Sequence, residues 1–219
     1  MDTVESRKSI GFLEDRSDWN RAPAVFDEHT LKISGHPVME DWEDGYMRRL
    51  AHIATMRGGR VLELGFGMGI SAGYIQEAKN LKEHIIIECH PDVIKNGMDM
   101  YREQIANRKM HILSGFWEDI TPLLKDGSFD GILFDTYPLS EEEIHGNHFW
   151  FFEEAYRLLK KGGVLTYYSD EATGFSQKHL LRLKAAGFHD ITYETVEVDP
   201  PADCEYWQDK TIIAPIVAK

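Results

Sequence analysis

Two short segments of this chain carry the residues best suited to chemistry. The segment 135–138 places a carboxylate, an aromatic ring and a proline directly after the apolar run 129–134. Upstream, the run 59–64 leads into a glycine-rich turn at 65–69. Ligands of open α/β sheets bind at the carboxyl ends of the strands. The two segments together therefore predict a nucleotide-type cofactor beside a pocket that favours a cation.

The glycine turn has the pattern G-x-G-x-G, formed by Gly65, Gly67 and Gly69. Glycine permits positive φ angles and a close approach of the backbone to a ligand. Glu88 ends the next expected strand about 20 residues on, where a carboxylate accepts hydrogen bonds from ribose hydroxyls. This combination suits NAD and S-adenosylmethionine alike.

A third piece follows the next expected strand, where Trp117 and Glu118 offer a ring to stack on adenine and a carboxylate for its exocyclic amine. The alternative is a buried Trp with Asp119 as a helix N-cap. S-adenosylmethionine is cationic at sulfur and suits an acidic, aromatic pocket, whereas the diphosphate of NAD favours positive or neutral surroundings. We therefore expect S-adenosylmethionine as the cofactor, with an NAD-dependent dehydrogenase as the rival.

The segment 37–47 is rich in Met, aromatic and acidic residues. Met39, Glu43, Tyr46 and Met47 recur at helical spacing, so one helix face could present them together. The alternative is an ordinary amphipathic helix whose carboxylates face solvent.

If Glu43 and Asp135 converge, their negative charges need a cation between them. A guanidinium group is planar, carries five N–H donors and pairs bidentately with carboxylates. Tyr137 could pack on its flat face. The pair therefore predicts a guanidine substrate.

The elements that must position these residues alternate along the chain from residue 59 onward, which predicts an α/β fold. The last two strands are joined by a loop too short for a crossover helix, so they must be antiparallel. This order predicts the class I methyltransferase fold, a Rossmann-like, seven-stranded, mostly parallel sheet with one antiparallel strand. The expected strands are 60–64, 83–88, 109–113, 129–134, 164–168, 191–198 and 210–218, and the expected helices are 70–78, 91–107, 149–159 (ended by Gly162 and Gly163) and 175–186.

We expect one domain overall, with three parts. Residues 1–16 form a flexible N-terminus, residues 17–57 a helical lid over the carboxyl edge of the sheet, and residues 58–219 the methyltransferase core.

Composition limits the class of protein further. The formal charge of −13 disfavours nucleic acid as a partner. No apolar run approaches the roughly 20 residues that span a bilayer, and residues 1–16 lack the apolar core of a secretory signal, so we expect a cytoplasmic chain with no membrane partner. We also expect a monomer or a homodimer. Cys89 and Cys204 are too few for a cysteine metal site and are expected as free thiols. His145 and His148 have metal-ligand spacing but no third ligand, so no metal is expected.

Several motifs make the chain resemble the guanidinoacetate N-methyltransferase family, whose members complete creatine synthesis. The similarity runs from about Trp19 to the C-terminus, and its most specific part is F-D-G-I-L-F-D-T-Y-P-L-S-E-E at 129–142. The other matching segments are 37–43, 58–69, 86–89, 117–119, 162–167 and 200–204.

The resemblance implies that Glu43 and Asp135 clamp the guanidino group. The residues that it implies around the cofactor are Trp19, Met39, Met47, Glu63, Gly65, Phe66, Gly67, Met68, Gly69, Ile70, Ser71, Glu88, Cys89, His90, Trp117 and Glu118.

One departure from the family concerns the far end of the substrate. Where the family has a leucine–threonine pair whose backbone amides receive a carboxylate, this chain has Asp170 and Glu171, followed by a shorter loop. Two acidic side chains repel a carboxylate and suit an amino group. We expect these residues to bind substrate together with Glu43, Asp135 and Tyr137. Alternatively, their side chains face solvent while their amides still bind a carboxylate.

The expected activity is N-methylation of a small guanidine, either of the guanidinoacetate type or free arginine, with agmatine also possible. Asp135 is the expected proton acceptor because it sits at a rigid strand end, and Glu43 holds the other edge of the guanidinium. Two alternatives remain, a protein-arginine methyltransferase and a non-catalytic S-adenosylmethionine-binding scaffold.

Overall fold

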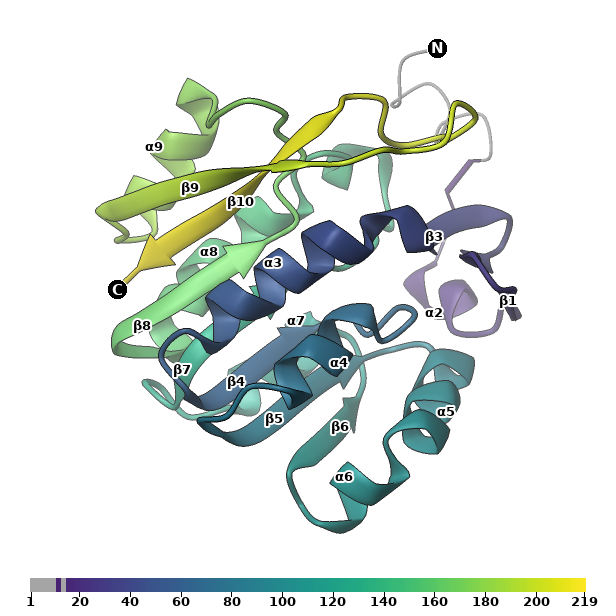
Figure 1. Cartoon of the computed structure of the whole chain (residues 1–219), viewed down its shortest axis with the longest axis horizontal. Coiled ribbons are helices and arrows are strands. Elements are labelled where there is room, and N and C mark those ends of the chain that lie inside the picture. The colour runs from purple at the N-terminus through teal and green to yellow at the C-terminus, as the bar shows by residue number, and fades with distance from the viewer. Residues whose placement is uncertain (1–10, 13–14) are drawn as a thin grey trace.

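The computed structural model describes residues 11–12 and 15–219. Its largest sheet has seven strands in the order β6-β5-β4-β7-β8-β10-β9. Neighbouring strands from β6 to β8 are parallel, and β10 is antiparallel to both β8 and β9 (Figure 1). The predicted class I methyltransferase fold is therefore confirmed. The strands are β4 (Gly59–Leu64), β5 (Leu81–Glu88), β6 (Met110–Ser114), β7 (Phe129–Phe134), β8 (Leu159–Tyr167), β9 (Asp190–Glu197) and β10 (Thr211–Ala218).

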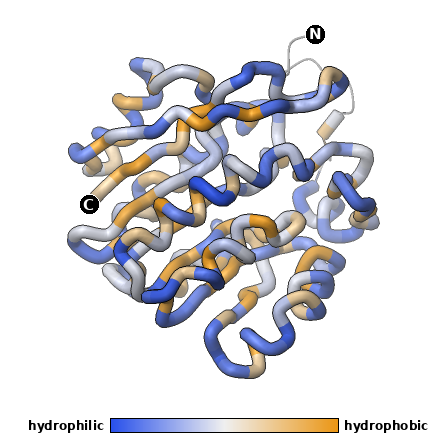
Figure 2. Tube along the Cα trace, in the orientation of Figure 1, coloured by the Kyte–Doolittle hydropathy of each residue, from blue (hydrophilic) through white to orange (hydrophobic). Residues whose placement is uncertain are grey.

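Helices cover both faces of this sheet, and each face has its own apolar cluster. Successive strand residues point to opposite faces, so Val61 packs in one cluster and Leu62 in the other. Hydrophobic residues accordingly concentrate along the strands in Figure 2. One cluster takes in α3 (Asp44–Thr55), α4 (Ile70–Gln76) and α5 (Pro91–Met100), and the other takes in α7 (Trp117–Ile120), α8 (Asn147–Leu158) and α9 (Gln177–Ala185).

The expectation of a helical lid over residues 17–57 was wrong for its middle part. After the short helix α2 (Arg16–Trp19), the strands β1 (Ala24–Phe26), β2 (Thr30–Ile33) and β3 (His36–Glu40) form a separate antiparallel sheet. Ser34 and Gly35 both have positive φ, 51° and 80°, so they form the kind of two-residue turn that joins hairpin strands.

The segment 37–47 is therefore not one helix. It passes from β3 through a 3-10 turn, η1 (Asp41–Glu43), into α3. Moreover, α3 packs on a face of the large sheet, against β7, β8 and β10, and not over its carboxyl edge. Most of the expected flexible N-terminus, 1–16, lies outside the described residues, so it stays a prediction along with the domain boundaries.

Two element boundaries also differ from expectation. The predicted helix 91–107 is broken at Tyr101, whose φ of −111° and ψ of 29° separate α5 from α6 (Arg102–Ala106). Gly162 and Gly163 do not end α8, because that helix passes directly into β8 at Leu159 and both glycines lie inside the strand.

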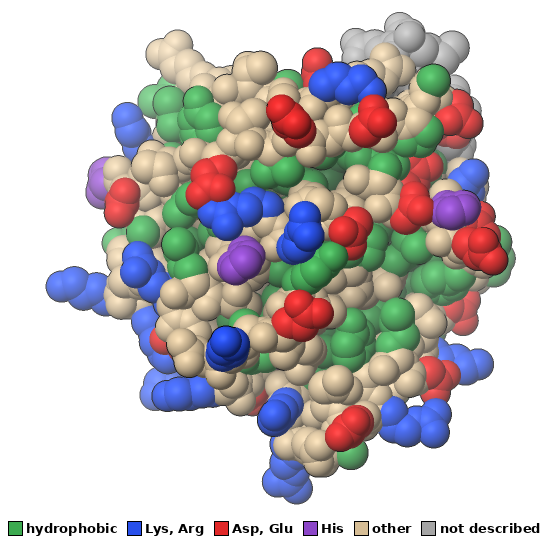
Figure 3. Space-filling view, in the orientation of Figure 1, with side chains coloured by type: hydrophobic (Ala, Val, Ile, Leu, Met, Phe, Trp, Pro, Cys, Tyr) green, Lys and Arg blue, Asp and Glu red, His purple; other side chains and the backbone are tan. Residues whose placement is uncertain are grey.

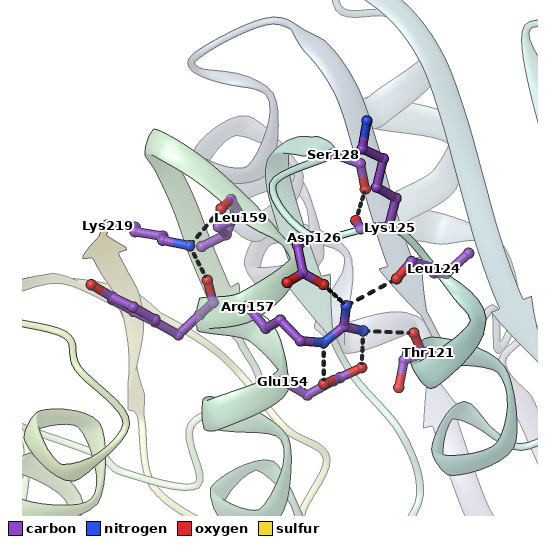
Figure 4. Close-up of polar contacts among 10 residues, drawn as sticks. Thr121, Leu124, Lys125, Asp126, Ser128, Glu154, Arg157, Leu159 and Lys219 are labelled. Atoms are coloured by element: carbon purple, nitrogen blue, oxygen red, sulfur yellow. Dashed lines mark hydrogen bonds and ion pairs between the residues drawn. The ribbon is translucent and has the colours of Figure 1, made fainter.

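Arg157 near the end of α8 fastens the connection that leads into β7 (Figure 4). Its guanidinium donates to the carboxylates of Glu154 and Asp126. It also donates to the carbonyl oxygens of Thr121 and Leu124, at 2.8 and 2.9 Å. One side chain thus ties a helix turn and a loop together just before the strand that ends at the predicted catalytic carboxylate.

The surface shows why net charge alone says little about partners. Acidic and basic side chains are interspersed over the face seen in Figure 3. Within the described part of the chain, no helix has both the length and the apolar character to cross a membrane. The absence of a nucleic-acid partner stays a prediction.

The backbones of β4 and β7 meet closely just beyond their carboxyl ends. The amide of Asp135 donates to the carbonyl of Leu64 at 2.9 Å. Gly65 follows with a φ of +86°, and a Cβ there would lie 1.9 Å from the carbonyl oxygen of Asp135. A glycine is therefore required at 65 by both conformation and space.

This contact predicts a large cost for Gly65→Ala. Alanine at positive φ costs about 1–2 kcal/mol, and forcing a methyl group into a packed site adds about 1–3 kcal/mol. We expect the loss in the free energy of unfolding, measured by urea titration, to be the sum of the two.

Gly162→Ala is the matched control. Its φ is +81°, yet a Cβ at this position would meet no other atom within 4 Å. Gly162→Ala should therefore lose only the conformational part, and equal losses in the two variants would contradict the steric argument.

Candidate active site

The described residues enclose a cavity of about 400 Å³ beyond the carboxyl ends of β4, β5 and β7. It brings together twelve of the predicted site residues, contributed by segments far apart in the sequence. They are Trp19, Met39, Glu43, Gly65, Gly67, Glu88, Cys89, Trp117, Glu118, Asp135, Tyr137 and Asp170.

The remaining predicted residues lie outside the lining of this cavity. They are Met47, Glu63, Phe66, Met68, Gly69, Ile70, Ser71, His90 and Glu171.

Glu63 and Ser71 flank the glycine turn on its buried side. Both are buried, and the Ser71 hydroxyl donates to Oε1 of Glu63. Nε2 of the fully buried His84 lies 2.8 Å from Oε2 of Glu63. This group fixes β4 and α4 on either side of the turn.

Asp170 and Glu171 do not act as a pair. Asp170 lines the cavity. Oε1 of Glu171 instead accepts the amide N–H of Ser176 at 3.1 Å and lies 3.3 Å from Nδ1 of His179. Asp170 has a φ of +54°, so the chain turns at this residue and directs the two side chains to different places.

Glu88 is held rigidly at the end of β5. Its Oε2 accepts the amide N–H of Phe66 at 2.9 Å, and its Oε1 accepts that of His90 at 2.8 Å. A carboxylate oxygen has a second lone pair, so Glu88 can still accept hydrogen bonds from a ligand in the cavity. Phe66 and His90, although outside the lining, thus orient the carboxylate.

Trp117 and Glu118 form another wall of the cavity at the start of α7. The Trp117 ring packs edge-on against Phe134 and Phe151, with centroids 5.8 and 5.3 Å apart. Burial raises the pKa of the Glu118 carboxyl. Asp119 lies inside α7 and Phe116 occupies the N-cap position, so the alternative that Asp119 caps the helix was wrong.

Aromatic side chains cover the cavity on the side of the N-terminal segment. Trp19 stacks on Tyr137 with centroids 5.1 Å apart and planes at 11°. The Tyr137 hydroxyl lies 2.9 Å from Nδ1 of His36, which comes from β3. Tyr137 is thus fixed between two N-terminal elements, with Trp19 over one face of its ring.

Glu43 and Asp135 are the acidic pair of the cavity. Glu43 ends η1 and is only 2% exposed. Its Oε1 accepts a hydrogen bond from the Tyr206 hydroxyl at 2.6 Å. Burial, and then the charge of Asp135, raise the pKa of the Glu43 carboxyl well above its ordinary range.

Tyr206 is the main residue that sequence reasoning missed. It lies in the loop between β9 and β10, two residues beyond the P-P-A-D-C segment at 200–204. The only signal was its position after that segment, because nothing in the sequence pairs Tyr206 with Glu43.

Cysteines and histidines form neither a disulfide nor a metal cluster within the described part of the chain. Cys89 and Cys204 are free thiols. Across residues 11–12 and 15–219, no group of three or more His, Cys, Asp or Glu side chains is arranged to hold a metal ion. The expectation that no metal takes part stays a prediction.

Comparison with known families decides what kind of site this is. Residues 12–219 match the sequence profile of the family described as guanidinoacetate N-methyltransferase. The chain belongs to this family. It is an S-adenosylmethionine-dependent methyltransferase, as the resemblance in its motifs predicted.

Curated relatives of this methyltransferase bear the name protein arginine N-methyltransferase 2. The one from Aspergillus oryzae is 32% identical over 198 residues, covering 82% of this chain and 46% of the relative. The one from Candida glabrata is 40% identical over 114 residues, covering 49% of this chain and 27% of the relative. The chain thus spans less than half the length of these relatives.

Solved structures share the fold of this methyltransferase. A spermidine synthase in complex with the transition-state analogue AdoDATO aligns with a TM-score of 0.68 at 14% identity, covering 90% of this chain and 72% of the other. A SAM-dependent methyltransferase from Archaeoglobus fulgidus aligns with a TM-score of 0.57 at 15% identity, covering 82% and 95%.

The cavity fits the cofactor on two observations. Gly67 lines the cavity with a φ of +53°, which lets a glycine backbone approach a ligand, and Sδ of Met39 packs 2.8 Å from where a Cβ would lie. The anchored carboxylate of Glu88 can accept hydrogen bonds from the ribose hydroxyls. The individual cofactor contacts of this methyltransferase stay predictions.

The raised pKa of Glu43 predicts a stability that falls with rising pH. Above 4.5, the ordinary value, the folded chain keeps a proton on Glu43 that the unfolded chain releases. Ionising this carboxyl at higher pH therefore costs stability. We expect Glu43→Gln to be more stable than the parent at pH 8, with a smaller gain at pH 5, by urea unfolding.

Glu197→Gln is the matched control, because Glu197 is exposed at the end of β9. It should change stability little at either pH. A loss of stability in Glu43→Gln that is the same at pH 5 and pH 8 would contradict the argument from burial.

Proposed function

We propose that this methyltransferase transfers the methyl group of S-adenosylmethionine to a nitrogen of a guanidino group. The observation that carries the proposal is the placement of Glu43 and Asp135 in one cavity with the glycine turn and Glu88. This arrangement puts two carboxylates that can bind a cation next to the glycine turn and Glu88, which together we call the cofactor cradle.

A guanidinium group matches such a pair in charge and shape. Two carboxylates in one cavity destabilise each other's charged form, which is the second cause of the raised pKa of Glu43. A planar cation with five N–H donors relieves that repulsion and can donate hydrogen bonds to both carboxylates, one along each of two edges.

The reaction requires the guanidinium to give up a proton. S-adenosylmethionine, when bound, supplies an electrophilic methyl group. A guanidinium has a pKa above about 12 and no good lone pair at neutral pH. Asp135 accepts the proton in our proposal, because it follows directly from β7 and its backbone is tied to Leu64.

Glu43 holds the other edge of the guanidinium and stabilises its charge. The Tyr206 hydroxyl fixes the Glu43 carboxyl, and the stacked Trp19 and Tyr137 rings limit the access of water. Most of the acceleration then comes from positioning and fixed charges, as is general for reactions between two bound molecules.

The substrate can be either a small guanidine or an arginine in a protein. The family description favours a small guanidine such as guanidinoacetate, with a role in creatine synthesis. The name of the curated relatives favours protein arginine. A cytoplasmic location and a monomeric or homodimeric state remain predictions.

We expect Asp135→Asn to abolish the proton acceptor while keeping the shape of the site. Loss of a positioned base typically costs about 10²–10⁴ in rate, so kcat/KM for methyl transfer to guanidines should fall by that order. Binding of S-adenosylmethionine, measured by calorimetry, should stay unchanged because the cradle lies on other strands.

The matched control is Asp209→Asn, at an exposed position outside the cavity lining. It should retain parental methyl transfer, read by mass spectrometry. Parental activity in Asp135→Asn would overturn the proposed role of this residue.

A further inference from the structure

The charge of the cavity lining extends beyond the acidic pair. Seven acidic residues line it, while among the described lining residues there is no Lys or Arg and one His. The five acidic residues besides Glu43 and Asp135 are Glu88, Glu118, Glu142, Glu143 and Asp170. A substrate with a lone carboxylate at its far end would enter this lining at an electrostatic cost.

Two of the five carboxylates are held by the protein's own amides. Glu88 accepts from Phe66 and His90, and Oε2 of Glu143 accepts the amide N–H of Leu139 at 2.8 Å. Asp170 differs from these two in its position. It follows β8, the strand beside β7, and so lies on the same wall of the cavity as Asp135.

The backbone fixes how Asp135 and Asp170 are spaced. Phe134 at the end of β7 pairs with Tyr167 at the end of β8, and the amide of Tyr168 donates to the Phe134 carbonyl at 3.0 Å. Tyr168 thus emerges beside Asp135, at the usual strand separation of about 4.8 Å. Asp170 follows two residues later, at up to about 3.3 Å per residue. That separation suits a ligand with a few methylene groups between two charged ends.

Asp170 is held in an unusual backbone conformation. Its φ is +54°, and that of His145, whose Nδ1 lies 3.2 Å from Oδ1 of Asp170, is +57°. Non-glycine residues pay a conformational cost in this left-handed region, and such strain concentrates at functional sites. The Asp170 side chain is only 11% exposed, so its carboxylate is directed by the fold.

Tyr168 supplies a second, independent observation. Its hydroxyl oxygen is buried and makes no hydrogen bond within the described residues, although the residue lines the cavity. Burial, and then the charges of Glu43 and Asp170, raise the pKa of this hydroxyl well above 10. A buried hydroxyl without a partner is costly, and an N–H donor of a ligand would satisfy it.

We infer that the substrate of this site is a guanidine with a protonated amine at its far end, which Asp170 recognises while Glu43 and Asp135 hold the guanidinium. The Tyr168 hydroxyl accepts a hydrogen bond from an N–H of the same ligand. This inference rests on the proposed function. Agmatine and free arginine both carry the required amine, whereas guanidinoacetate and an arginine inside a peptide do not.

The test compares guanidines that differ only at the far end. Agmatine ends in an ammonium, butylguanidine in a methyl group and 4-guanidinobutyrate in a carboxylate. A hydrogen bond to a charged group contributes about 1.5–3 kcal/mol, so kcat/KM for agmatine should exceed that for butylguanidine by about tenfold or more. The carboxylate should be the poorest substrate. Arginine, tested alongside, distinguishes a site that takes any such amine from one that rejects its additional carboxylate.

Asp170→Asn tests the residue itself. Asn tolerates the left-handed conformation, and thermal unfolding checks that the variant folds. It should lower kcat/KM for agmatine by about tenfold and leave the value for butylguanidine unchanged. Asp209→Asn, exposed and outside the lining, should change neither. Calorimetry of the three ligands with the parent enzyme gives the same ranking without a variant.

The outcomes separate this inference from the proposed function. Equal kcat/KM and equal affinity for agmatine and butylguanidine would overturn the inference and leave the proposed function standing. Better methylation of Nα-acetylargininamide than of agmatine would overturn it in favour of an arginine within a peptide. Preferred binding of agmatine without methyl transfer would support the amine contact and overturn the proposed reaction. No binding and no transfer with any guanidine would overturn both.

Discussion

The close approach of Gly65 to the carbonyl of Asp135 is the constraint on which the rest of the site depends. It occurs where the strand order reverses, because β4 lies between β5 on one side and β7 on the other. Ligand sites of open α/β sheets form at such switch points. Here the reversal puts the glycine turn and Asp135, the proposed proton acceptor, in contact through backbone alone, so their relative position depends little on the surrounding loops.

The site also opposes stability, and the fold compensates for it locally. A carboxyl that is 2% exposed and faces a second carboxylate disfavours its own charged form. Tyr206 donates to it, Trp42 packs beside Tyr206 with ring centroids 5.8 Å apart, and Arg157 fixes the entrance to β7. The arrangement is typical of a binding site that keeps groups in place for a ligand at some cost to the ligand-free chain.

The features that sequence could predict are those with strong local signals. The glycine turn, the alternation of strands and helices and the final antiparallel strand follow from residue type and spacing, and Asp135 follows from its position after an apolar run. The hairpin at Ser34 and Gly35 was missed because helical spacing of apolar residues in 37–47 competed with it. The sequence could not predict that the side chains of Asp170 and Glu171 separate, because this depends on one residue in the left-handed conformation. It also could not predict the hydrogen bond between Glu43 and Tyr206, because this depends on tertiary folding.

The hydrogen bond between Tyr206 and Glu43 joins residues 163 positions apart, and this has a consequence for synthesis on the ribosome. The carboxyl of Glu43 leaves the exit tunnel early, while its donor emerges only with the loop before the last strand. A nascent chain that has completed β9 already contains β4 and β5, whereas Tyr206 has not yet been made. The cavity then still lacks the Tyr206 hydroxyl that donates to Glu43. Among the described elements, β10 is thus the last to be made, and it must insert between β8 and β9, two strands that precede it in the chain.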